Sequence, residues 1–167
     1  LREELAARQN VTLVGGDALA EDWGALLEQA GPAPHTVCGN LPYLITGRLL
    51  EKTVELGSRI ASATLMVQLE VAQRLLAAPG TKDYGALTVF VRASFEVERL
   101  LVARAGAFLP RPNVDSTVVV LRALIEPVTR EDAIFRALVK AAFASRRKTL
   151  RNNLKGLVAA PRRRSGE

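Results

Sequence analysis

The feature that most constrains the fold is an alternation of short apolar segments with stretches of helix-forming residues. Residues 36–39 and 62–69 are typical of buried strands, because they are short, apolar and rich in β-branched side chains. Residues 11–14 predict a third strand of the same kind. Helices are predicted around these strands, over residues 1–9, 22–30, 46–56 and 71–78. This order predicts an α/β fold with a mostly parallel sheet.

The pattern changes after Tyr84 and Gly85. Residues 86–94 predict a helix, and two strands are then predicted over residues 95–102 and 115–123. The connection between these strands is rich in proline. We therefore expect them to form an antiparallel pair at the edge of the sheet.

The C-terminal part is predicted to be helical. Glu126 and Pro127 end the last strand, and residues 132–144 and 148–158 predict two helices. We expect three parts: a sheet-containing domain over residues 1–125, a small basic helical domain over 126–158, and a flexible tail over 159–167.

The charge of the chain is concentrated at its C-terminal end. The whole chain carries a formal net charge of +6, whereas the part from Arg136 onward has ten basic residues and one acid, Glu167. Such asymmetry predicts a polyanionic partner that is bound by one end of the protein. A solvated basic helix is the alternative, and an acidic membrane surface is a weaker one.

Cysteine and histidine are each present once, as Cys38 and His35. The sequence therefore predicts no disulfide framework, no metal site, and a cytoplasmic protein. No apolar run approaches the roughly 20 residues that cross a bilayer, so we expect no membrane span. The chain begins with Leu1 in what reads as the middle of a helix, which predicts a piece of a longer protein. We expect a monomer.

The strand predicted over 36–39 is followed directly by four residues whose groups suit one kind of chemistry: Asn40, Leu41, Pro42 and Tyr43. Ligands bind at the carboxyl ends of strands in open α/β sheets. The exocyclic amine of adenine is a poor nucleophile, because its lone pair is delocalised into the ring. The Asn40 side-chain oxygen and the Leu41 carbonyl would accept its hydrogens and align it with a methyl donor.

The other two residues of this turn would support that role. Pro42 restricts Leu41 to an extended conformation, and Tyr43 offers a flat face to an extruded base. A turn that only caps a strand is the alternative.

Six stretches together carry a resemblance to a known family: 16–19 (GDAL), 40–45 (NLPYLI), 67–75 (VQLEVAQRL), 83–85 (DYG), 108–116 (FLPRPNVDS) and 143–154 (FASRRKTLRNNL). They resemble the bacterial small-subunit ribosomal RNA adenine dimethyltransferases, relatives of the eukaryotic Dim-type enzymes and of the macrolide-resistance methylases. The resemblance implies an α/β fold: an incomplete Rossmann-like sheet of a methyltransferase that uses S-adenosylmethionine (SAM), with an antiparallel edge pair and a small C-terminal helical domain.

The resemblance also implies roles for individual residues. Asp17 would accept a hydrogen bond from the adenine amino group of SAM, and Ala18 would line the same pocket. Asn40 would serve both cofactor and target, while Phe108 would close over the target base opposite Tyr43. The alternatives are a turn or capping residue for Asp17 and a core phenylalanine for Phe108.

The basic run of the C-terminal end resembles the segment with which the ribosomal dimethylases contact folded rRNA. Arginine side chains grip phosphates bidentately and position RNA without reading its sequence. We expect this role for Arg146, Arg147, Lys148 and Arg151. Arg111, between two prolines, is either a further phosphate contact or a solvated loop residue.

Two parts that the family resemblance leads one to expect do not occur in this sequence. One is the initial strand with its glycine-rich turn for SAM, and the other is the set of further C-terminal helices. The implied function is dimethylation of two adjacent adenosines near the 3′ end of small-subunit rRNA. The alternatives are a non-catalytic rRNA-binding or assembly factor, and a large-subunit methylase of the macrolide-resistance type.

Overall fold

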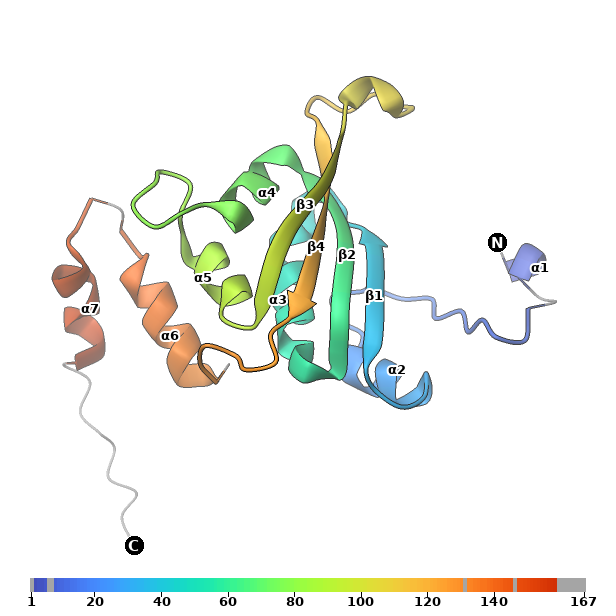
Figure 1. Ribbon diagram of the computed structural model, residues 1–167, viewed down its shortest axis with the longest axis horizontal. Coiled ribbons are helices and arrows are strands. Elements are labelled where there is room, and N and C mark those ends of the chain that lie inside the picture. Colours follow the sequence, from blue (N-terminus) through green and yellow to red (C-terminus); the bar gives the residue numbers. More distant parts are fainter. Residues whose placement is uncertain (1, 6–7, 131, 146, 159–167) are drawn as a thin grey trace, which may run out of the picture.

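The computed structural model describes residues 2–5, 8–130, 132–145 and 147–158. At its centre is a sheet with the strand order β1-β2-β4-β3, in which β1 is His35–Asn40, β2 is Ile60–Gln68, β3 is Phe95–Ala103 and β4 is Ser116–Ala123 (Figure 1). β1 pairs with β2 in parallel, whereas β4 pairs with both β2 and β3 antiparallel. The antiparallel edge pair is confirmed. The expected mostly parallel order is wrong for the described strands, because β4 lies between β2 and β3 and runs against both.

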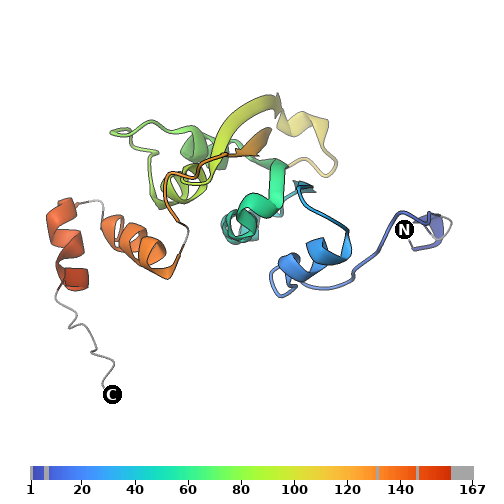
Figure 2. The same cartoon turned by 60° about the horizontal axis from the view of Figure 1, so that its bottom comes forward.

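The described helices are α1 Arg2–Leu5, α2 Trp23–Gln29, α3 Thr46–Leu56, α4 Leu69–Leu76, α5 Ala86–Arg92, α6 Ala133–Ala142 and α7 Leu150–Val158. Helices α3, α4 and α5 lie against one face of the sheet, and α6 and α7 follow beyond α5 (Figures 1 and 2). None of these helices is long and apolar enough to cross a membrane.

The core lies between the sheet and α3. Leu49, Leu50 and Val54 recur on one face of α3 and are buried, as the helical period requires. They pack in one cluster with Leu65 of β2 and with Phe95, the first residue of β3. Gly57, with a φ of 55°, ends the helix in a left-handed conformation that other residues rarely adopt. The core therefore fixes β1 and β2, whose carboxyl ends carry the candidate site.

The segment before α2 differs from the prediction. Residues 11–14 form no strand, and Val11, Leu13 and Val14 are exposed. A short strand is stable only when a neighbouring strand takes up its N–H and C=O groups, and no described strand pairs with this segment. The helix predicted over residues 1–9 is described only as α1, Arg2–Leu5.

The helical C-terminal part packs against the sheet-containing part. Phe135 of α6 meets Phe90 of α5 edge-on, with 5.8 Å between the ring centroids. Arg136 forms an ion pair with Glu55 of α3 at 2.9 Å. Asp132 caps α6 by accepting a hydrogen bond from the amide of Phe135.

Helix α7 begins two residues later than predicted. Its start follows Thr149, whose carbonyl and hydroxyl oxygens both accept a hydrogen bond from the amide of Asn152. A threonine in this position satisfies a free helix amide. The flexible tail expected over residues 159–167 lies outside the described residues.

Candidate functional site

The candidate site begins where β1 ends. Asn40 is the last residue of the strand and is exposed. The amide of Leu41 donates a hydrogen bond to the carbonyl of Met66 at 3.0 Å, which continues the parallel pairing one residue beyond β1. The Leu41 side chain is buried. The backbone on both sides of the Asn40 side chain is therefore fixed, while the side chain itself faces outward.

Pro42 connects this backbone to the next helix. It has an extended conformation, with φ −60° and ψ 131°. Its carbonyl accepts hydrogen bonds from the amide of Ile45 at 3.2 Å and from the hydroxyl of Thr46 at 2.9 Å. The short 3-10 turn η1 (Tyr43–Ile45) thus leads directly into α3. Residues 40–43, hereafter the 40–43 turn, are held at both ends.

Tyr43 is fixed by a residue far away in the sequence. Its hydroxyl lies 2.9 Å from the hydroxyl of Ser116. Ser116 is the first residue of β4 and is buried, whereas Tyr43 is 38% exposed. The hydrogen bond therefore anchors the tip of the ring in the protein and leaves ring surface accessible for stacking.

The connection between β3 and β4 forms the opposite wall. Asp115 holds it: its carboxylate accepts a hydrogen bond from the amide of Ala105 at 2.8 Å, and its carbonyl accepts one from the amide of Leu69 at 3.0 Å. Phe108 follows the short 3-10 turn η3 (Ala105–Ala107) in this connection.

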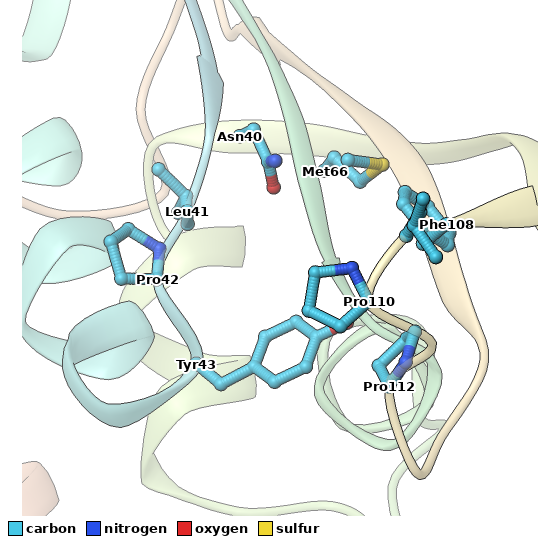
Figure 3. A pocket seen from close by; sticks show the side chains of 9 residues that line it. Asn40, Leu41, Pro42, Tyr43, Met66, Phe108, Pro110 and Pro112 are labelled. Carbon is cyan, nitrogen blue, oxygen red and sulfur yellow. The ribbon is translucent and has the colours of Figure 1, made fainter. Parts of the chain in front are cut away.

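The two walls enclose an open cavity of about 380 Å³. The 40–43 turn lines one side and Phe108 the other, as the side chains in Figure 3 show. A cavity of this size falls in the range of about 300–1,000 Å³ that is typical of small-molecule sites. The structure therefore brings together all five residues that the sequence assigned to the target base, from segments more than 60 positions apart.

Of the three residues assigned to the cofactor, Asn40 lines this cavity, whereas Asp17 and Ala18 lie outside it. The Asp17 carboxylate accepts a hydrogen bond from the amide of Leu19 at 2.9 Å, and the carbonyl of Ala18 accepts one from the Trp23 indole at 2.9 Å. Neither residue lines the cavity beside Asn40. Asp17 also does not follow a strand, since residues 11–14, which the sequence predicts to be one, form none. Within the described residues Asp17 has the geometry of a turn residue.

The residues assigned to RNA are exposed where they are described. Arg111 lies between Pro110 and Pro112, which line the cavity, but it is not itself a lining residue. Arg147 and Lys148 lie in the connection that precedes α7, and Arg151 lies in the first turn of that helix, so the basic run is only partly helical. Arg146 lies outside the described residues.

Sequence reasoning missed several residues of the site. Met66, Leu109, Pro110 and Pro112 also line the cavity, and Ser116 anchors Tyr43. Nothing in the sequence signals that Ser116 has a hydrogen-bond partner 73 positions away, because the hydroxyl groups come together only through the tertiary fold. No group of three potential metal-ligating side chains of the His, Cys, Asp and Glu types occurs in the part of the chain that the structure describes.

Comparisons with known proteins show the family of the chain. Residues 1–165 match the family described as ribosomal RNA adenine dimethylase. The chain is 46% identical over 166 residues to the ribosomal RNA small subunit methyltransferase A of Moorella thermoacetica, covering 94% of this chain and 57% of that protein. It is 44% identical over 154 residues to the protein of the same name from Chromobacterium violaceum, covering 90% of this chain and 56% of that protein.

Two solved structures are also similar. A dimethyladenosine transferase from Plasmodium falciparum superposes with a TM-score of 0.75 at 27% identity, covering 92% of this chain and 53% of that chain. The 23S rRNA methyltransferase ErmE superposes with a TM-score of 0.62 at 30% identity, covering 98% of this chain and 63% of that chain. The mixed sheet with its helices is thus of the Rossmann-like methyltransferase type, and this chain spans little more than half the length of the curated relatives it matches. The chain belongs to the ribosomal RNA adenine dimethylase family.

Proposed function

We propose that this chain provides the target-adenine side of a SAM-dependent dimethylase of small-subunit rRNA. One observation carries the proposal: a single cavity is lined by the 40–43 turn and by Phe108. The name of the two bacterial relatives favours the small subunit as substrate. The large-subunit alternative has the weaker support of the structural similarity to ErmE.

The chemistry of the cavity suits an aromatic amine. An adenine base between Tyr43 and Phe108 would stack on one or both rings. The Asn40 side-chain oxygen and the Leu41 carbonyl would accept the two amine hydrogens, which favours the pyramidal amine and directs its lone pair. Asn40 is exposed at the cavity, and its neighbouring backbone is already held by the hydrogen bond from Leu41 to Met66, so little reorganisation is needed.

The fit to SAM is only partial. SAM, when bound, supplies the methyl group. Asn40 is suitably placed for a group at the end of β1, but Asp17 and Asn40 line no common cavity within the described residues. We therefore propose the cofactor role of Asp17 and Ala18 from the family resemblance alone. The same observation favours the second candidate, a non-catalytic rRNA-binding factor.

The division of labour along the chain belongs to the same proposal. Residues 1–125 would act on the base, and residues 126–158 would hold the RNA through Arg147, Lys148 and Arg151, whose side chains are exposed. Arg146 and Arg111 would add phosphate contacts. We also propose that the protein works as a monomer in the cytoplasm, where rRNA is matured in bacteria.

The direct test is methyl transfer from labelled SAM to immature small ribosomal subunits. We expect Asn40→Ala to lower the rate by about 100- to 1,000-fold, the usual effect of removing one preorganised polar group. Asn113→Ala is the matched control, because Asn113 is an exposed asparagine outside the cavity lining. Methylation that persists after Asn40→Ala would remove the proposed role of that residue.

Calorimetry with SAM separates the two candidate functions. If the chain is part of an enzyme, we expect SAM binding to release or absorb heat with the wild-type protein and to be lost in Asp17→Ala. If the chain is a non-catalytic RNA-binding factor, we expect no heat of SAM binding with the 167-residue chain, while salt-sensitive RNA binding remains.

A further inference from the structure

A second hollow lies between the α4–α5 loop, residues 77–85, and the connection from α6 to α7. Its volume is about 320 Å³. Thr81, Lys82 and Tyr84 line it from the loop, and Phe143, Ser145 and Lys148 line it from the connection. We name it the loop–hairpin groove. In Figures 1 and 2 the loop and the connection lie next to each other on the side of the molecule that carries α5 and α6.

The loop side of the groove is built in place. The Thr81 hydroxyl donates a hydrogen bond to the carbonyl of Ala78 at 2.8 Å, and the amide of Tyr84 donates one to the carbonyl of Thr81 at 3.3 Å. Gly80 has a φ of 85°, which a residue with a side chain rarely adopts. These local bonds give the loop one defined course.

The other side of the groove is formed by the hairpin of α6 and α7, which is also held by hydrogen bonds. The side-chain amide of Asn153 donates hydrogen bonds to the carbonyls of Ala142 at 2.8 Å and Ser145 at 3.0 Å, and so joins α7 to the end of α6. The amide of Lys148 donates to the carbonyl of Ser145 at 3.1 Å. The two sides meet at the rings of Tyr84 and Phe143, whose centroids are 6.0 Å apart. The groove therefore exists before any ligand binds.

The groups around the groove favour an anion. Lys82 and Lys148, which carry ammonium groups, and Ser145, which carries a hydroxyl group, line the groove, and no aspartate or glutamate among the described residues lines it. Asp83 is adjacent in the loop but does not line the groove. The sequence from residue 133 to residue 166 contains no acidic residue at all. The two ammonium groups and the Ser145 hydroxyl suit the oxygens of a phosphate group, whereas the Thr81 hydroxyl is already used as a donor to Ala78.

We propose that the loop–hairpin groove binds a phosphate of the RNA backbone and so extends the RNA contact from the basic end to the α4–α5 loop. The inference rests on the proposed function, since it presumes an RNA partner. RNA is favoured over an isolated anion because Lys148 is continuous with exposed Arg147 and with Arg151 on α7, which would hold neighbouring phosphates. Lys82 is the new element, because it comes from the sheet-containing part of the chain.

The test compares lysine variants of the 167-residue chain in binding to a small-subunit rRNA transcript over a series of salt concentrations. We expect Lys82→Ala to weaken binding about 5- to 10-fold, as loss of one solvent-exposed hydrogen bond does, and to lower the salt slope by about 1. Lys82→Arg should retain most of the affinity, because it keeps the charge. Lys155→Ala, an exposed lysine of α7 outside the groove, removes the same charge and should change affinity less than about twofold.

Several results would overturn the inference. If Lys82→Ala behaves like Lys155→Ala while the wild-type chain binds RNA, the groove is not a contact and the proposed function stands. If the wild-type chain does not bind the transcript, both fail together. Inorganic phosphate serves as the second probe: competition by millimolar phosphate that removes the whole effect of Lys82 would show a free-anion site instead. Thermal unfolding of each variant shows whether loss of the fold explains a loss of affinity. If it does, the wild-type chain is acetylated with and without RNA, and the contact requires that RNA protects Lys82 from acetylation.

Discussion

The cavity lined by the 40–43 turn and Phe108 was assigned to the target base, and the segment around Asp17 to the cofactor. The two regions are held in place in different ways. At the cavity, the Tyr43 hydroxyl is hydrogen-bonded to the hydroxyl of Ser116, 73 positions away in the sequence. The amide of Leu41 is hydrogen-bonded to the carbonyl of Met66 on the neighbouring strand. Around Asp17, the carboxylate is bonded to an amide only two positions away. Long-range bonds place a residue relative to the fold, whereas local bonds only shape its turn.

The difference concerns how firmly each of the two proposed sites is held. A side chain positioned by the sheet keeps its geometry as long as the core is intact, and it can form a preorganised site. The Asp17 turn is tied to the rest of the fold by the Lys52 ammonium, which donates hydrogen bonds to the carbonyls of Leu19 and Glu21 at 3.0 and 2.7 Å, and by the Leu19 side chain, which packs against the core. The segment before it, with its exposed valines and leucine, has no strand partner in the described residues.

The comparison predicts the largest effect in the core below the cavity. Leu65 of β2 is 1% exposed, so Leu65→Ala should lower the free energy of unfolding by about 2–5 kcal/mol through the cavity it leaves. Leu13 is 42% exposed, and Leu13→Ala should change it by less than about 0.5 kcal/mol. Urea unfolding followed by circular dichroism measures both. A costly Leu13→Ala would mean that the first segment is packed after all.

A smaller effect is expected at the hydrogen bond that anchors the cavity. Ser116→Ala and Tyr43→Phe each remove one partner, and each should cost about 0.5–1.5 kcal/mol of unfolding free energy. The double variant should cost clearly less than the sum of the two, because both changes break the same bond. Strictly additive losses would show that the two hydroxyl groups act independently.

The most local effect is expected at Asp17. Asp17→Ala removes the acceptor of the Leu19 amide, which should lower local stability by about 0.5–1 kcal/mol. Asp17→Asn retains an acceptor oxygen and should leave the Leu19 amide protected from hydrogen exchange. Hydrogen exchange at that amide distinguishes the two variants, and equal exchange rates in both would contradict a role for the side chain in this turn.

The sequence was sufficient where local signals decide the structure. The predicted limits of α3 agree with the observed ones, and Asp132 marks the start of α6, because helical period and capping are local properties. The 40–43 turn was predicted for the same reason. Thr149 is a capping signal too, and reading it would have placed the start of α7 correctly.

Sequence reasoning failed where structure depends on distant partners. Residues 11–14 have the composition of a strand, but composition supplies no neighbour to pair with. The hydrogen bond between Tyr43 and Ser116 and the place of Met66 in the cavity both depend on which strands are neighbours, and hydrophobic alternation gives the face of a residue but not its neighbouring strand. The same limit applies to the loop–hairpin groove, whose two sides are about 60 positions apart.

Asn153 bears on how the protein would meet RNA. Its amide, which sequence reasoning would assign to the surface of α7, is committed to two backbone carbonyls at the end of α6. The order of the hairpin is thus established during folding and not at binding. Association with RNA would then lack the large negative heat-capacity change of coupled folding, and its free energy would come from released counterions instead.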